Sequence, residues 1–140
     1  FRLNDVQSSR GNRGMKTRVL VVDDEPALTR MIKLNLESAG TYEVYTENDG
    51  VNAINAVREF RPDLILLDIM MPDKSGDDIA QELRDEPKLS TIPIVFLTAL
   101  VTPDETGAKA SKIGGNIFLA KPVSADELVA VIEKTLNSGG

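Results

Sequence analysis

The 140-residue sequence contains no cysteine, histidine or tryptophan. Without cysteine the chain forms neither a disulfide nor a thiolate nucleophile, which favours a cytoplasmic protein. The absence of histidine excludes a Ser-His triad, the usual zinc sites and a phosphohistidine on this chain. Two tyrosines and four phenylalanines offer little for base stacking, and the net charge of −6 opposes direct binding to nucleic acid. Any chemistry must therefore rest largely on acidic side chains.

Long apolar runs are missing too. No run in the sequence approaches the ~18–20 apolar residues that a membrane span needs, so we expect no membrane segment. Residues 1–14 are rich in Arg, Asn, Ser and Gly without an apolar period, which predicts a tail or an extension outside the fold. Residues 15–137 are predicted to form one domain, and residues 138–140 a tail or the root of a linker.

Short apolar runs recur along the predicted domain. Residues 18–22, 63–67 and 92–97 are almost entirely Val, Ile, Leu and Phe, a pattern typical of parallel strands that helices cover on both faces. Residues 43–46 alternate between polar and apolar, and residues 116–119 form only a short run. We expect these last two segments to be strands at the edges of the sheet.

Helix signals occupy the intervening segments. Pro26 suits the first turn of a helix, and residues 102–105 and 124–127 both match the capping box, in which Ser or Thr and Glu satisfy each other's backbone amides. Residues 106–114 carry only Ile113 as a large apolar side chain, which predicts either a weakly held helix or an ordinary surface helix. Five strands alternating with five helices predict an α/β fold with a doubly wound, five-stranded parallel sheet.

Polar side chains come directly after four of the predicted strands. Residues 23–25 (Asp-Asp-Glu) follow the first strand, Asp68 the third, Thr98 the fourth and Lys121 the fifth. In a doubly wound sheet, ligands bind beyond the carboxyl ends of the strands, so these groups should converge at one edge. Crowded carboxylates need a cation or raised pKa values, and Mg²⁺ prefers hard oxygen ligands and phosphate as a co-ligand. The pattern predicts a magnesium-assisted phosphoryl site.

Four motifs carry a family resemblance. VLVVDDEP, LILLDIMMPDKSG, IVFLTA and FLAKP occur in this order across residues 16–136. Together they resemble the response regulator receiver domain of two-component signalling, similar to chemotaxis regulators. The resemblance implies a flavodoxin-like parallel sheet with strand order 2-1-3-4-5 and five surrounding helices, in agreement with the prediction from periodicity.

The resemblance implies a role for each matching residue. Asp68 would be the phosphoacceptor. Asp24 would bind Mg²⁺ directly and Asp23 through water, while Asp68 and the backbone carbonyl of Met70 would complete the protein ligands.

The remaining roles concern the phosphoryl group and the switch. Thr98, Lys121 and the backbone amide of Ala99 would hold the phosphoryl oxygens. Phe118 occupies the position of the switch aromatic, where many relatives have tyrosine. The bond between Lys121 and Pro122 is expected to be cis.

The implied function is a signalling switch rather than an enzyme, with catalysis limited to its own phosphorylation and dephosphorylation. A sensor histidine kinase or a phosphotransfer protein would phosphorylate Asp68 in a Mg²⁺-dependent reaction. The surface formed by the predicted fourth helix, fifth strand and fifth helix (residues 102–136) would then change and control a partner protein or an output domain. The resemblance also leaves open whether phosphorylation leads to a dimer.

Three alternatives differ in chemistry. A constitutive interaction module without phosphorylation is the main one, although its degenerate relatives usually lose one of the acidic residues or the lysine. A phosphatase of the dehalogenase class would need a second Asp two residues after Asp68, where Met70 stands. A flavin site is disfavoured, because the carboxylates of residues 23–25 would repel the flavin phosphate.

Overall fold

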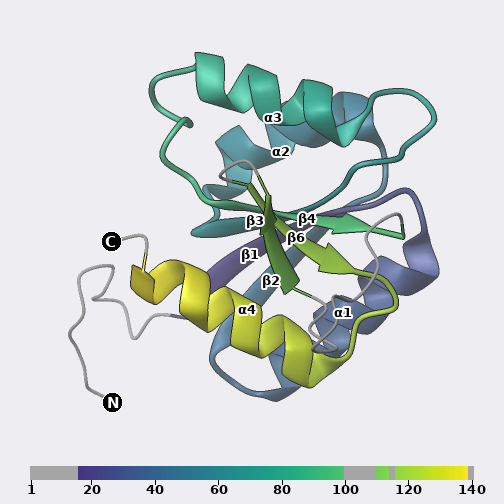
Figure 1. Cartoon of the computed structure of the whole chain (residues 1–140), viewed down its shortest axis with the longest axis vertical. Helices are drawn as coiled ribbons and strands as arrows, with labels where there is room; N and C mark the ends of the chain where they lie inside the picture. The colour runs from purple at the N-terminus through teal and green to yellow at the C-terminus, as the bar shows by residue number, and fades with distance from the viewer. Residues whose placement is uncertain (1–15, 100–109, 114–115, 139–140) are drawn as a thin grey trace.

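The computed structural model describes residues 16–99, 110–113 and 116–138, which include a single six-stranded sheet with helices on both faces (Figure 1). The predicted tail at residues 1–14 and the predicted capping box at residues 102–105 lie outside the described residues. Among the described helices, none is long and apolar enough to cross a membrane. The strands are β1 (Thr17–Val22), β2 (Tyr42–Glu47), β3 (Leu64–Asp68), β4 (Ile94–Thr98), β5 (Ala110–Ile113) and β6 (Asn116–Ala120).

The strand order is β2-β1-β3-β4-β6-β5. The first five strands in this order are parallel to one another, and β6 is the strand predicted as the fifth in the sequence. The predicted order 2-1-3-4-5 is therefore confirmed. The register aligns Val22 with Leu67, Asp68 with Leu97, and Thr98 with Ala120. The carboxyl ends of the four central strands therefore meet at one edge of the sheet.

Helices form one layer on each side of the sheet (Figure 1). α1 and α4 cover one face, and α2 and α3 cover the other, so the chain is doubly wound as predicted. The capping box at residues 124–127 is confirmed: Ser124 N donates to Glu127 Oε1 at 2.9 Å, and Glu127 N donates to Ser124 Oγ at 3.2 Å. The helices are α1 (Pro26–Ser38), the short 3-10 helix η1 (Gly50–Asn52), α2 (Ala53–Phe60), α3 (Gly76–Asp85) and α4 (Ala125–Ser138).

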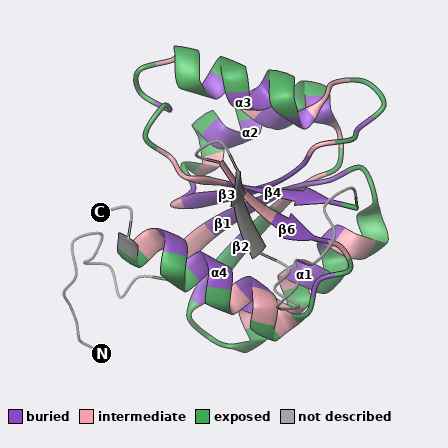
Figure 2. Cartoon of the chain, in the orientation of Figure 1, coloured by how far each residue is buried: buried purple, intermediate pink, exposed green. Residues whose placement is uncertain are grey.

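The sheet separates two hydrophobic clusters, one on each face (Figure 2). On the first face, Ile32 from α1 and Leu128 from α4 are fully buried over the strands. On the second face, Val57 from α2 and Leu83 from α3 are buried in the same way. Because neighbouring residues in a strand point to opposite faces, the continuous apolar runs of the sequence supply both clusters at once.

One predicted element is wrong. Within the segment 106–114, expected to be helical, residues 110–113 form β5, which pairs antiparallel with β6 at the edge of the sheet, and the rest of the segment lies outside the described residues. As a result β6 lies between β4 and β5, and residues 116–119 are not at the edge as expected. A helix with Ile113 as its one large apolar residue would bury little surface, whereas a strand at this edge satisfies its backbone groups by hydrogen bonds to β6.

The opposite edge of the sheet is the outer side of β2. There Val44 N donates to Glu37 Oε2 at 3.0 Å, and Lys33 Nζ donates to Val44 O at 2.7 Å. Lys33 and Glu37 are themselves paired at 2.9 Å, one turn apart on α1. The two side chains thus satisfy both backbone groups of an edge residue, which are otherwise open to pairing with another strand. We refer to this pair as the edge clasp.

Candidate functional site

Backbone hydrogen bonds fix the site residues at the ends of their strands. Asp23 N donates to Glu47 O at 3.1 Å, and Lys121 N donates to Thr98 O at 2.9 Å. Each residue thereby continues the ladder of its strand by one step. The peptide bond between Lys121 and Pro122 is cis, the form that the family resemblance implies.

Gly76 holds the turn that comes after Asp68. A Cβ atom at Gly76 would lie 2.3 Å from the Asp68 carbonyl oxygen and 2.8 Å from the Ile69 Cα, both of which are backbone atoms. Gly76 N also donates to Ile69 O at 2.9 Å. Only glycine permits this approach, so the first turn of α3 packs directly against the strand end that carries Asp68.

The side chains at this edge converge on Lys121. Its Nζ lies 2.8 Å from Asp23 Oδ2, 3.4 Å from Asp68 Oδ1 and 3.4 Å from Glu25 Oε1. The Asp23 and Asp68 side chains are almost fully buried, and that of Glu25 is 64% exposed. Asp68 Oδ1 also lies 3.4 Å from Met70 N, at the long limit of a hydrogen bond. The sequence prediction that these groups meet at one edge is therefore realised for Asp23, Asp68 and Lys121.

Burial sets the electrostatics of the cluster. Two causes raise the pKa of Asp68 to about 6: burial away from solvent is the larger, and the negative charge of Asp23 is the smaller. Burial also raises the pKa of Asp23, against the opposing attraction of Lys121. For Lys121, burial alone would lower the pKa, but the two aspartates outweigh it and raise the value. Two carboxylates and one ammonium thus leave net negative charge in a poorly hydrated site.

A divalent metal fits these residues. Carboxylate oxygens of Asp23, Asp24 and Asp68 all lie within 4.8 Å of one another. Asp23 Oδ2 is fully buried and, among the described residues, has no partner in hydrogen-bond geometry, although Lys121 Nζ forms an ion pair with it. Hard oxygen donors with one unsatisfied buried oxygen match the ligands that Mg²⁺ prefers, and a cation would offset the excess negative charge.

The other predicted residues surround this cluster. Thr98 is buried at the end of β4, and Ala99 follows it as an exposed residue. The Met70 side chain is 62% exposed, so only its backbone is suited to the interior of the site. Phe118 is half-buried on β6, and its ring stacks on Phe96 with a centroid distance of 5.2 Å.

Glu25 had no separate role in the prediction from sequence, yet the structure places it in contact with Lys121. One signal was available. Glu25 precedes Pro26 at the start of a helix, where Ser, Thr, Asp or Asn would normally cap, and a long side chain there is poorly suited to capping. The contact itself depends on side-chain reach across two loops, which the sequence pattern does not reveal.

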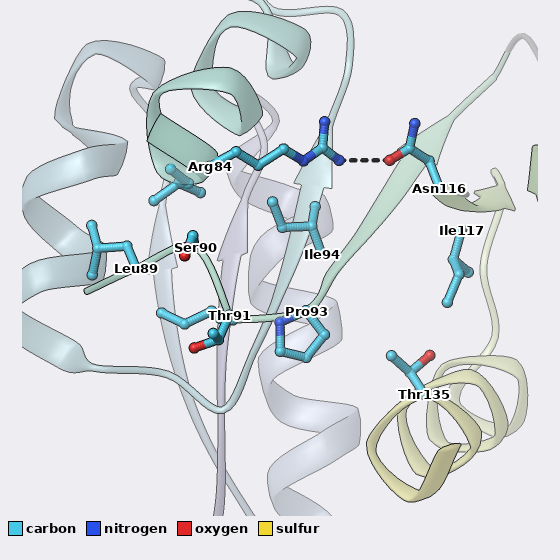
Figure 3. A pocket seen from close by; sticks show the side chains of 11 residues that line it. Arg84, Leu89, Ser90, Thr91, Pro93, Ile94, Asn116, Ile117 and Thr135 are labelled. Carbon is cyan, nitrogen blue, oxygen red and sulfur yellow. Dashed lines mark hydrogen bonds between the residues drawn. The ribbon is translucent and has the colours of Figure 1, made fainter. Parts of the chain in front are cut away.

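A separate hollow of about 230 Å³ lies at the other end of the strands, beside the amino ends of β4 and β6 (Figure 3). Arg84 and Asn116 meet across its rim, where Arg84 Nη2 donates to Asn116 Oδ1 at 2.6 Å. Ile117 and Thr135 form another part of the wall. Its described lining residues include no carboxylate, so this hollow lacks the chemistry of the acidic cluster.

Comparison with known proteins gives the same assignment. The family model of the response regulator receiver domain matches residues 19–133. The DNA-binding response regulator MtrA of Mycolicibacterium smegmatis is 38% identical over 122 residues, which cover 87% of this chain and 51% of that protein. The chain thus spans about half the length of the curated relatives that it matches.

Solved receiver structures share the fold. The Francisella response regulator 1452 receiver domain has a TM-score of 0.72 at 28% identity, with 89% of this chain and 100% of that chain covered. The chemotaxis protein CheY4 of Vibrio cholerae has a TM-score of 0.71 at 29% identity, with 85% and 98% covered. Sequence, fold and site agree, and the chain belongs to the response regulator receiver domain family of two-component signalling.

Proposed function

We propose that this receiver domain is a switch that accepts a phosphoryl group on Asp68. The observation that carries the proposal is the meeting of Asp23, Asp68 and Lys121 at one buried edge of the sheet, with Asp24 beside them. The phosphodonor would be a sensor histidine kinase or a phosphotransfer protein. A partner protein or an output domain would respond, and the chain itself would catalyse only its own phosphorylation and dephosphorylation.

In the proposed reaction, an Asp68 carboxylate oxygen forms a bond to phosphorus. The bond between phosphorus and the donor's leaving atom breaks, and the leaving group departs with that electron pair. Asp24, Asp68 and the Met70 carbonyl, with Asp23 acting through water, would hold Mg²⁺, which would neutralise charge on the phosphoryl oxygens. Lys121 Nζ lies 3.4 Å from Asp68 Oδ1, so it needs only a small movement to pair with a phosphoryl oxygen.

Thr98 and Ala99 would complete the phosphoryl site. Thr98 ends β4 and follows Leu97, the residue that pairs with Asp68 in the register of the sheet, and its hydroxyl would donate to one phosphoryl oxygen. The backbone amide of Ala99 would donate to another. Because Thr98 is the last residue of β4 and Ala99 follows it directly, neither donor would need a large backbone movement to reach the group.

The switch would act through Phe118 and β6. When Thr98 moves toward the phosphoryl group, the Phe118 ring would fill the vacated space by packing inward. In this structure the ring already stacks on Phe96 and packs against the buried cluster under α2 and α3. Phosphorylation would therefore favour an arrangement that the unphosphorylated protein already samples. The surface that changes would include β6 and α4, with or without dimer formation.

Phosphorylation can be tested by intact mass. The protein would be incubated with Mg²⁺ and acetyl phosphate, beside an Asp68→Asn control and a sample containing EDTA. We expect the gain of one phosphoryl group, lost in both controls. A folded wild-type protein that gains nothing would refute the proposal and favour a constitutive interaction module.

The switch needs a separate test with Thr98→Ala. We expect this variant to accept the phosphoryl group but to show a smaller change in amide hydrogen exchange over β6 and α4 than the wild type. Equal changes in the two proteins would contradict the coupling of Thr98 to this surface.

A further inference from the structure

Glu25 makes a contact that the proposed reaction does not use. Its carboxylate lies 3.4 Å from Lys121 Nζ, on the exposed side of the site, whereas Asp23 and Asp68 contact the same ammonium from the buried side. Because the Glu25 side chain is 64% exposed, solvent screens this ion pair and it contributes little to folding. The contact instead places a negative charge where an anionic phosphodonor must approach Lys121.

Hydrogen bonds fix the backbone of Glu25, whereas its side chain is not used to cap the helix and can contact Lys121. Glu25 N donates to Asp23 Oδ1 at 3.0 Å, and Glu25 O accepts hydrogen bonds from Leu28 N and Thr29 N, both at 3.1 Å. Although Glu25 holds the capping position of α1, its side chain makes no capping hydrogen bond. The residue is therefore anchored beside the site by its main chain, with its carboxylate turned to Lys121.

We propose that Glu25 is a positioning residue that holds Lys121 at the entrance of the site and competes there with the incoming phosphodonor. The inference rests on the proposed phosphorylation of Asp68. Lys121 Nζ contacts the exposed Glu25 carboxylate and, at the same time, the buried carboxylates of Asp23 and of the acceptor Asp68. A phosphoryl group must displace the Glu25 contact before Lys121 can pair with it, so Glu25 raises the donor concentration needed for half-maximal rate.

The test measures initial rates of phosphorylation against acetyl phosphate concentration at saturating Mg²⁺. For Glu25→Gln we expect the half-saturating donor concentration to fall about two- to fivefold, the factor that corresponds to an exposed charge interaction. The maximal rate should stay within about twofold of the wild type, because Asp68 and its buried neighbours are unchanged. The difference should shrink at high salt, since exposed charges are screened.

Two variants control this experiment. Glu59→Gln removes the same charge from the exposed surface of α2 and should leave the half-saturating concentration unchanged. Glu25→Asp keeps the charge and should remain closer to the wild type than Glu25→Gln. Two outcomes would overturn the role of Glu25 while phosphorylation itself stands. In one, the half-saturating donor concentration of Glu25→Gln equals that of the wild type. In the other, Glu59→Gln lowers this concentration as much as Glu25→Gln does. A wild-type protein that accepts no phosphoryl group would overturn both.

Discussion

Replacing Asp68 with asparagine should stabilise the protein when Mg²⁺ is absent. Burial, together with the charge of Asp23, raises the pKa of Asp68 from 3.8 to about 6. Each pKa unit corresponds to about 1.4 kcal/mol, so ionised Asp68 costs the folded state up to about 3 kcal/mol at pH 7. Asparagine has nearly the same shape and no charge, and Lys121 keeps its 2.8 Å contact with Asp23. We therefore expect the Asp68→Asn variant to be the more stable protein.

The pH dependence is set by the sign of the shift. The folded-state pKa of Asp68 lies above the unfolded value, so the folded protein binds the proton more tightly. The stability that this proton provides is complete below about pH 4 and is lost as the pH rises through about 6. The wild type should consequently match the Asp68→Asn variant near pH 4 and fall behind it between pH 4 and pH 7.

Urea unfolding followed by circular dichroism suits the measurement, since the chain has no tryptophan for fluorescence. A difference of about 3 kcal/mol moves the midpoint by about 1–3 M urea. Saturating Mg²⁺ should narrow the gap, because a ligand at a hundred times its Kd stabilises the wild type by about 2.7 kcal/mol. Asp24→Asn, an exposed change at the same edge, serves as the control. An Asp68→Asn variant no more stable than the wild type at pH 7 without Mg²⁺ would refute the reasoning.

Other predictions concern packing and backbone contacts. Gly76→Ala should lose about 1–3 kcal/mol of unfolding free energy, because the new Cβ would meet the Asp68 carbonyl at 2.3 Å; a urea midpoint equal to the wild type would contradict this. Ser124→Ala should cost about 1 kcal/mol through loss of the helix cap, measured by thermal melting, and an unchanged Tm would argue against the cap. Glu37→Ala should speed hydrogen exchange at the Val44 amide, whose acceptor it removes, with protection in β3 unchanged as the internal control. Equal exchange rates at Val44 in the two proteins would rule out the edge clasp.

The central sheet could be predicted because its strands are buried on both faces. Continuous apolar runs at residues 18–22 and 63–67 leave few other structures for these segments, and parallel strands bring the residues after their carboxyl ends to one edge. The convergence of Asp23, Asp68 and Lys121 could be predicted from that rule alone. Local pattern gave the wrong structure for residues 110–113, because the choice between helix and edge strand there depends on pairing with the neighbouring strand.

Side-chain contacts beyond the strand ends were less accessible to prediction. Nothing in the spacing of Lys33 and Glu37 shows that both reach Val44, eleven and seven residues away. The contact of Lys121 with Glu25 joins residues 96 positions apart. Such contacts depend on how far flexible side chains extend once the backbone is folded, and many rotamers of Lys and Glu would not make them.

The two hydrophobic clusters on either side of the sheet have a consequence for how this sequence can diverge. Leu128 and Ile32 pack on one face, Leu83 and Val57 on the other, with the strand backbones between them. A change of side-chain volume in one cluster finds its compensating neighbours within that cluster, because closely packed residues are the ones that couple. Compensating substitutions should therefore arise in pairs confined to one face. Substitutions could then accumulate in the cluster on one face, and change the helices and the partner surface on that face, without substitutions in the other cluster.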